Sequence, residues 1–147
     1  MKINAKMHYG LKAMIELALY AGEKGMLQKE IAERQCMPNK FMDAVIHALK
    51  VAGLIVNIAG KKSGYKLARD PDEITVYEVY RAFSPDLYIH YCLAGNEVCP
   101  RSGFCASHQF FYGFNNDMVT YMKSNTIRML MEVQEELNQN AILAKAT

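Results

Sequence analysis

Residues 27–52, LQKEIAERQCMPNKFMDAVIHALKVA, contain two short helical patterns separated by a tight break. The stretch LQKEIAERQ spans about two helical turns, and CMPNK ends it, with Pro38 at a position that the first turn of a helix tolerates. A second helix is therefore predicted from Pro38 to about Ala52. Its apolar side chains form one stripe: Phe41, Val45, Ala48, Leu49 and Ala52. Two short helices joined by a tight turn, the second with a polar outer face, are typical of a helix-turn-helix.

The outer face of this second helix carries side chains that can read bases in the major groove of DNA. Asn39 can pair with adenine, Lys40 can reach guanine or a phosphate, and Asp43 can accept from a cytosine amino group. Asp43 would discriminate among sequences instead of adding affinity, because a carboxylate is repelled by phosphates. His47 can contact bases or phosphates, and Gln28 in the preceding helix completes this set of candidates. For each residue taken alone, a solvated helix face is the simpler explanation.

The flanking segments complete a winged-helix pattern. Residues 11–19 have the apolar spacing of an amphipathic helix, which the segment AGEKG ends. Two β-rich runs, 54–58 and 65–68, enclose a loop that carries Lys61 and Lys62. This pattern predicts a hairpin, the wing, whose lysines contact phosphates or the minor groove of flanking DNA.

A capping box marks the start of the next helix. Thr75 and Glu78 have the spacing at which each side chain accepts from the other's backbone N–H, and Ile74 and Val79 are placed as a hydrophobic staple. A helix is therefore predicted to begin at about Val76.

The stretch HQFFYGFNNDMVTYMK, residues 108–123, predicts a long helix. Its apolar residues form a broad stripe: Phe110, Phe111, Phe114, Met118, Tyr121 and Met122. Because the winged-helix core is already complete without it, this helix is expected to pack against the same helix of a second subunit. The alternative is an intramolecular core helix. Thr126 is placed to cap a last, short helix that reaches Leu137.

Charge divides the chain into two unlike halves. Residues 1–70 carry 12 Lys and Arg against 6 Asp and Glu, a balance of +6, whereas residues 71–147 carry 5 against 9, a balance of −4. The basic half suggests contact with a polyanion, although a solvated basic face has equal weight from charge alone. Lys12 and Glu16 interrupt the apolar run near the start, and no run reaches the roughly 18 apolar residues of a membrane span. A cytoplasmic protein without membrane contact is expected.

The segment YCLAGNEVCPRSGFCASH, residues 91–108, holds three of the four cysteines. Cys92, Cys99, Cys105 and His108 lack the close C-x2-C pairs of most zinc sites, and their wider spacing suits an iron–sulfur cluster, whose usual ligands are thiolates. A Cys3His zinc site, a thiol–disulfide switch and unconnected cysteines remain alternatives. Cys36, in the turn of the helix-turn-helix, is interpreted as a small, packed structural residue.

These motifs, in this order and with these lengths, resemble the Rrf-type (IscR- and NsrR-like) family of bacterial winged-helix transcription regulators. The resemblance covers roughly residues 1 to 135 and rests on MKINAKMHYGLKAMIELAL, IAERQ, GLIVNIAGKKSGYKLARD, ITVYEVYRA and the cysteine segment. It implies a homodimer with a winged helix-turn-helix domain at 1–83, a cluster-binding loop at 84–108, and a dimerisation helix with a C-terminal helix at 109–147. The fold class is then mainly α with a small β-hairpin.

The resemblance also implies that Cys92, Cys99 and Cys105 are metal ligands and that His108 is the fourth, as in the IscR-like branch, so that [2Fe-2S] is favoured over [4Fe-4S]. The first cysteine gap has six residues instead of five, and Ala59 stands where IscR-like members have a minor-groove arginine. His8 lies in a region from which NsrR-like members supply a ligand across the dimer, so a [4Fe-4S] cluster with His8 stays open.

The function expected is a DNA-binding transcription regulator, a repressor, that binds a palindromic operator in double-stranded DNA and senses its signal through a labile iron–sulfur cluster. The alternatives are a zinc- or thiol-based regulator on the same fold, or a small iron–sulfur electron-transfer or carrier protein. An enzyme is not expected, because no nucleophile–base pair or phosphate-binding glycine loop accompanies the cysteines.

Overall fold

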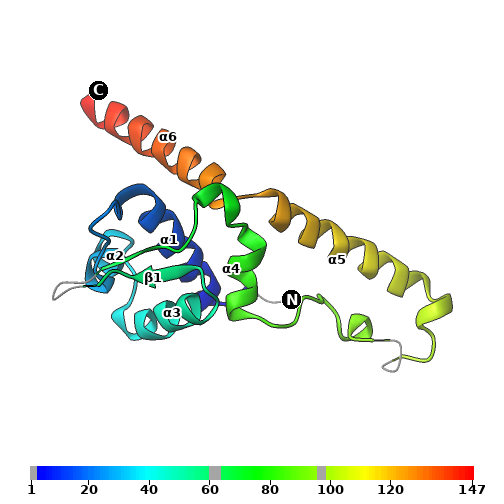
Figure 1. The fold of residues 1–147 in the computed structure, drawn as a ribbon. Coiled ribbons are helices and arrows are strands. Elements are labelled where there is room, and N and C mark those ends of the chain that lie inside the picture. Colours follow the sequence, from blue (N-terminus) through cyan, green and yellow to red (C-terminus); the bar gives the residue numbers. More distant parts are fainter. Residues whose placement is uncertain (1–2, 60–63, 96–98) are drawn as a thin grey trace.

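The computed structural model describes residues 3–59, 64–95 and 99–147 and is mainly α-helical with one two-stranded antiparallel hairpin (Figure 1). The helices are Ala5–Tyr20 (α1), Gln28–Arg34 (α2), Asn39–Val51 (α3), Val76–Phe83 (α4), Ala106–Ser124 (α5) and Ile127–Ala146 (α6), and the strands are Ile55–Asn57 (β1) and Tyr65–Leu67 (β2). Three short 3-10 turns complete the fold: Pro71–Glu73 (η1), Tyr91–Leu93 (η2) and Ser102–Phe104 (η3). No helix in these described ranges is long and apolar enough to cross a membrane.

Local capping interactions begin α1 and α4, and of these two starts the sequence predicts the one at α4. The Asn4 side chain accepts the Met7 N–H at 2.8 Å and starts α1. At α4 the predicted capping box is confirmed, because Thr75 Oγ1 accepts the Glu78 N–H at 3.2 Å and Glu78 Oε2 accepts the Thr75 N–H at 2.9 Å. These bonds satisfy N–H groups that a helix leaves without intrahelical partners.

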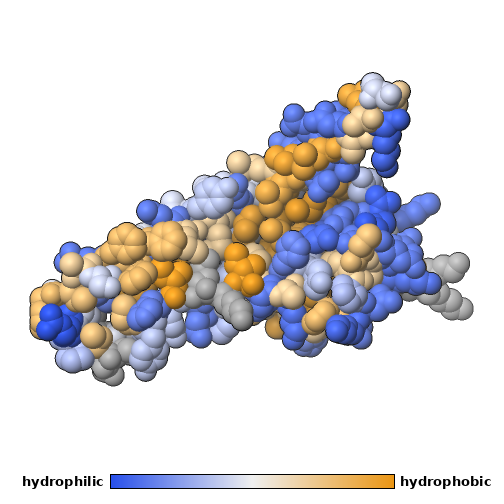
Figure 2. Space-filling view, turned by 180° about the vertical axis from the view of Figure 1, so that it is seen from behind, coloured by the Kyte–Doolittle hydropathy of each residue, from blue (hydrophilic) through white to orange (hydrophobic). Residues whose placement is uncertain are grey.

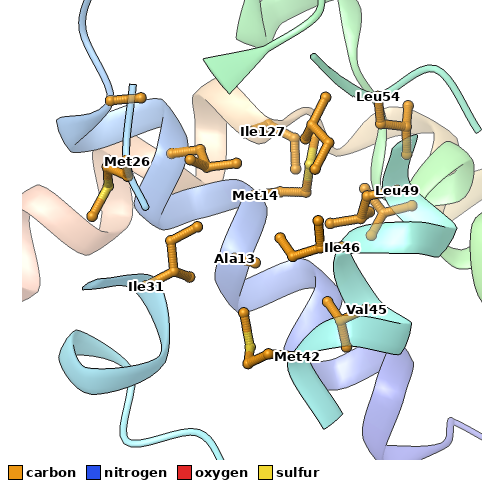
Figure 3. Packing of buried hydrophobic residues seen from close by; sticks show 14 of the residues in the cluster. Ala13, Met14, Met26, Ile31, Met42, Val45, Ile46, Leu49, Leu54 and Ile127 are labelled. Carbon is orange, nitrogen blue, oxygen red and sulfur yellow. The ribbon is translucent and has the colours of Figure 1, made fainter. Parts of the chain in front are cut away.

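The core forms where α1 crosses α3, and α2, the hairpin, α4 and the start of α6 close around it (Figure 3). Met14 and Leu17 of α1 are buried against the inner stripe of α3, with Ile127 of α6 reaching the same cluster. That stripe consists of Met42, Val45, Ile46 and Leu49. The sequence-based stripe was wrong at its C-terminal end, because Ala52 lies beyond the last helical residue and is exposed, whereas Ile46 faces α1.

The hairpin pairs Ile55 with Leu67 and Asn57 with Tyr65, and it is attached to the helices through Met26. The Met26 N–H donates to the Tyr65 carbonyl at 2.9 Å, and the Tyr65 N–H donates to the Met26 carbonyl at 2.7 Å. Gly64 permits this approach, because a Cβ there would lie 2.6 Å from the Met26 nitrogen. The predicted wing is confirmed as a hairpin, while Lys61 and Lys62 lie outside the described residues.

Two C-terminal helices leave the winged-helix part in different directions (Figure 1). α5 projects away from the core beside the cysteine segment, while α6 lies along α1. Thr126 caps α6 through the Met129 N–H, as predicted, but α6 continues to Ala146 and is longer than the short helix expected. Its first turn is joined to the start of α4, because the Ile127 N–H donates to the Ile74 carbonyl at 2.9 Å.

Candidate DNA interface and metal centre

The polar face predicted for α3 is exposed. Asn39, Lys40, Asp43 and His47 all point to solvent while the opposite face of the helix is buried in the core. A helix that is held by its buried side and presents a row of donors and acceptors is suited to the major groove.

Gln28 and Asp43 form a pair across the turn of the helix-turn-helix. Gln28 Nε2, in the first turn of α2, donates to Asp43 Oδ1 on α3 at 2.7 Å. The bond gives the carboxylate a donor and leaves Oδ2 as a further acceptor. It also orients the side chain, so the two predicted residues act as one unit.

An ion pair with one buried member, the Glu16 carboxylate, joins α2 to α1. Glu16 on α1 is 3% exposed, and its carboxylate accepts from the Arg34 guanidinium and, at 2.5 Å, from Gln35 Nε2. The hydrogen bond to Glu16 raises the pKa of Arg34 above its ordinary range. The Arg34 guanidinium lies 3.9 Å above the Tyr20 ring, whose hydroxyl accepts from Asn138 Nδ2 of α6 at 3.3 Å. α1, α2 and α6 are thus connected through one polar network, which sequence reasoning missed because its members are far apart in the chain.

Cys36 does not have the packed environment that was predicted. It is exposed and has φ 51° at the residue following the C-cap of α2, where its N–H donates to the Glu33 carbonyl and the next N–H donates to the Ala32 carbonyl. These two bonds form a Schellman motif, whose left-handed residue is usually glycine. The side chain points to solvent because the backbone, and not side-chain packing, makes this turn.

The cysteine segment runs beside α5 and supplies three free, partly buried thiols. Cys92 lies in η2, the Cys99 carbonyl accepts the Ser102 N–H at 3.1 Å, and Cys105 is the N-cap residue of α5. His108 lies in the first turn of α5 and stacks on Tyr112 with ring centroids 6.5 Å apart. Within the described residues, the His108 Nδ1 atom is buried and has no hydrogen-bond partner.

The donor set fits a thiolate-bound group in its chemistry, although the described part of the chain does not gather it into one site. Three thiols and an imidazole nitrogen without a partner are the ligand types of iron–sulfur and zinc centres. Among residues 3–59, 64–95 and 99–147, no group of three or more His, Cys, Asp and Glu side chains is placed to hold a single metal ion. Cys92 and Cys105 lie in separate local turns, one in η2 and one at the N-cap of α5.

A long apolar surface covers α5 and continues onto α6 (Figure 2). Phe110, Phe114 and Tyr121 lie on one face of α5 and are 67%, 49% and 71% exposed. Between α1, α4 and α5 this surface deepens into an open groove of about 600 Å³, in which His8 and Asp117 are the polar lining residues. The prediction of a helix with excess apolar surface is confirmed, and the intramolecular alternative is not what the chain adopts.

A helix-turn-helix whose second helix presents a polar face, followed by a β-hairpin, defines the class of winged-helix DNA-binding transcription regulators. The family model Rrf2, described as iron-dependent transcriptional regulator, matches residues 3–133. The chain therefore belongs to the Rrf2 family.

Relatives of similar length support this assignment. The HTH-type transcriptional regulator IscR of Aliivibrio salmonicida is 29% identical over 139 residues, which are 95% of this chain and 82% of the relative. Protein rrf2 of Nitratidesulfovibrio vulgaris is 27% identical over 141 residues, 96% of this chain and 94% of the relative. Among solved structures, T. potens IscR has a TM-score of 0.75 at 28% identity and covers 93% of this chain and 90% of its own. CymR, the global cysteine regulator of B. subtilis, has a TM-score of 0.74 at 27% identity, and the match covers 90% of this chain and 98% of the CymR chain.

Proposed function

We propose that this Rrf2-family transcription regulator is a homodimeric, cytoplasmic repressor that binds a palindromic operator and senses its signal through an iron–sulfur cluster. The observation that carries the proposal is the position of Cys105 as the N-cap of α5, the helix that exposes the aromatic stripe. A change in the cysteine segment therefore acts directly on the proposed dimer helix. The chain works by binding and not by catalysis.

Dimerisation is supported by the aromatic stripe of α5. Three large aromatic side chains, Phe110, Phe114 and Tyr121, stand in water on one helix face, which is unfavourable for an isolated monomer. A two-fold partner would cover the stripe with the same residues and would place two α3 helices about 34 Å apart, the spacing of palindromic half-sites.

Operator binding is assigned to α3, the Gln28–Asp43 pair and the wing. Asn39, Lys40 and His47 would contact bases or phosphates, and the paired Asp43 would select among sequences. Lys61 and Lys62, outside the described residues, are proposed to contact flanking phosphates.

The proposed cluster ligands are Cys92, Cys99, Cys105 and His108, with [2Fe-2S] favoured over [4Fe-4S]. When bound, a cluster supplies a labile link among the thiolates that a redox or chemical signal can alter. The His108 Nδ1 atom, without a partner among the described residues, is available as a ligand. His8 lines the groove with Asp117, which lies about 18 Å along α5 from Cys105. His8 could therefore complete only the site of a partner subunit.

The mechanism proposed has two states. Closure or release of the segment 92–108 moves the N-terminal end of α5, and α5 in turn contacts α4 of the winged-helix domain. A shift of α5 in both subunits would change the spacing of the two recognition helices and so the operator affinity.

The first experiment is anaerobic purification with visible absorption spectroscopy and iron, sulfide and zinc assays per monomer. We expect iron and acid-labile sulfide in near-equal amounts, with charge-transfer bands that Cys99→Ala abolishes. Cys36→Ala is the matched control and should keep the bands, because Cys36 lies outside the segment. DNA footprinting with both variants should then show regulation lost only in Cys99→Ala. Unchanged cluster-dependent binding in Cys99→Ala would contradict the proposal.

A second experiment tests the dimer. Phe114→Glu places one charge from each subunit in the proposed interface. A loss of about 2 kcal/mol per side chain would weaken the dimer about a thousandfold in analytical ultracentrifugation. Asn116→Glu is the control, because Asn116 is exposed on the same helix but on a different face. Equal effects of the two substitutions would argue against the stripe as the interface.

A thiol-based regulator is the second candidate, and a specific observation favours it. All four cysteines are free, and one structural relative is the oxidised form of Staphylococcus aureus CymR, with a TM-score of 0.70. Absence of iron and sulfide after reconstitution, together with a disulfide mapped by mass spectrometry or one zinc per monomer, would support this candidate or its zinc-based form over the cluster.

A further inference from the structure

The start of the cysteine segment is held on α5 by two side chains. His90 Nδ1 accepts the Cys92 N–H at 3.2 Å, and the His90 ring stacks on Phe111 with centroids 5.5 Å apart and an interplanar angle of 13°. One helical turn along α5, Asn115 Oδ1 accepts the Ile89 N–H at 3.0 Å. Neither His90 nor Asn115 belongs to the predicted ligand set.

We propose that His90, supported by Asn115, is a positioning residue that holds Cys92 on α5 before any cluster binds. The proposal rests on the proposed function in one respect, that Cys92 is a ligand. His90 shapes the ligand site through the backbone of Cys92 and is not itself a ligand.

Two of the cysteines, Cys92 and Cys105, are thereby held in fixed positions relative to α5. Cys105 is the N-cap of α5, and Phe111, under the His90 ring, lies six residues later, or about 9 Å along the helix axis. Between the two anchored cysteines the chain has a conformation that only glycine adopts readily, at Gly95 with φ 146°. Two of the proposed ligands therefore share one frame before the cluster binds, and fewer conformations are lost on binding.

Histidine is suited to this position because it combines two properties. Its flat ring stacks on Phe111, and its Nδ1 acceptor caps the 3-10 turn that contains Cys92. The hydrogen bond places the ring proton on Nε2 and occupies Nδ1. His108 differs, because its Nδ1 has no partner among the described residues and is left for coordination.

The same contacts couple the cysteine segment to α5. Loss of the cluster would remove the thiolate links, but the His90 and Asn115 contacts would keep residues 89–92 on α5. Residues 89–92 then stay on α5 when the cluster is lost, and the change is carried by the residues after Cys92, which include α5. In variants without these anchors, residues 89–92 should move as well.

The test uses two complementary substitutions in the full chain. His90→Phe keeps the stacking ring but removes the acceptor, and His90→Asn keeps an acceptor suited to a cap but removes the ring. His47→Phe is the matched control, since His47 is an exposed histidine on α3, outside the segment.

The first readout is amide hydrogen exchange of Cys92 in the apo protein. We expect exchange about fivefold faster in His90→Phe, partial restoration in His90→Asn, and no change in His47→Phe. Faster exchange of Ile89 in Asn115→Leu, but not in Asn115→Asp, would confirm the second anchor. Equal Cys92 exchange in wild type and His90→Phe would overturn the proposal.

The second readout is cluster loss to a chelator after anaerobic reconstitution, followed by visible circular dichroism. We expect several-fold faster loss and an altered spectrum in His90→Phe, with partial rescue in His90→Asn. Wild-type rates in both variants would refute a positioning role. If wild-type protein takes up no cluster, the proposed function fails, while the apo exchange rates still decide whether His90 positions Cys92.

Discussion

Removal of the Arg34 guanidinium should lower the free energy of unfolding more than the loss of an exposed ion pair would. In Arg34→Met the Glu16 carboxylate, 3% exposed, would keep Gln35 as its one remaining hydrogen-bond partner among the described residues. Breaking a fully buried pair costs about 3–5 kcal/mol. Because the Arg34 side chain is 48% exposed, water can replace part of its contribution, and we expect a loss of about 2–3 kcal/mol in the free energy of unfolding.

The assay is equilibrium unfolding in urea at constant protein concentration, because a dimer's stability depends on concentration. Lys29→Met is the matched control: the Lys29–Glu33 pair, at 3.7 Å, is 80% and 66% exposed, and its loss should cost less than about 0.5 kcal/mol. Adding Glu16→Gln to Arg34→Met removes the buried charge and should recover about 1 kcal/mol or more. A cost for Arg34→Met no larger than for Lys29→Met, or strict additivity in the double variant, would refute the reasoning.

Two other predictions follow from local geometry. Burial alone would raise the Glu78 pKa, but the Thr75 N–H and the Arg69 guanidinium together lower it below its ordinary value of 4.5. The stability that ionised Glu78 contributes is therefore present above that value and is lost as pH falls through the lowered pKa. In thermal unfolding, the Tm of the wild type should exceed that of Glu78→Gln by more at pH 7 than at acidic pH. A difference in Tm that does not change with pH would contradict this assignment. Cys36→Gly should stabilise the protein by about 0.5 kcal/mol, because glycine adopts the left-handed turn at φ 51° without strain. A loss of stability in urea unfolding would show that the thiol makes a compensating contact.

The winged-helix part could be predicted because its signals are local. The capping box at Thr75, the break at Pro38 and the two β-rich runs each act within a few residues, and the structure confirms them. The exposed face of α3 was likewise predicted, because helical spacing fixes which side chains are opposite the core.

Predictions that depended on side-chain packing were wrong at two residues. Cys36 was expected to be packed, and Ala52 was expected to join the buried stripe, but one lies in a left-handed turn and the other beyond the end of α3. The extension of α6 to Ala146 was also missed, since α6 packs along α1, which lies more than a hundred residues earlier in the chain.

The candidate functional site shows the same difference between local signals and tertiary packing. The sequence alone determined which residue types are available: a basic N-terminal half, a polar outer face on α3, three cysteines with a histidine, and an apolar stripe on α5. The tertiary structure decided which of them act together. Gln28 meets Asp43 across 15 residues, Arg34 meets Glu16 across 18, and Asn115 meets the Ile89 amide across 26. Periodicity and capping report only neighbours within a turn or two of helix, whereas these pairs exist because separate helices pack together.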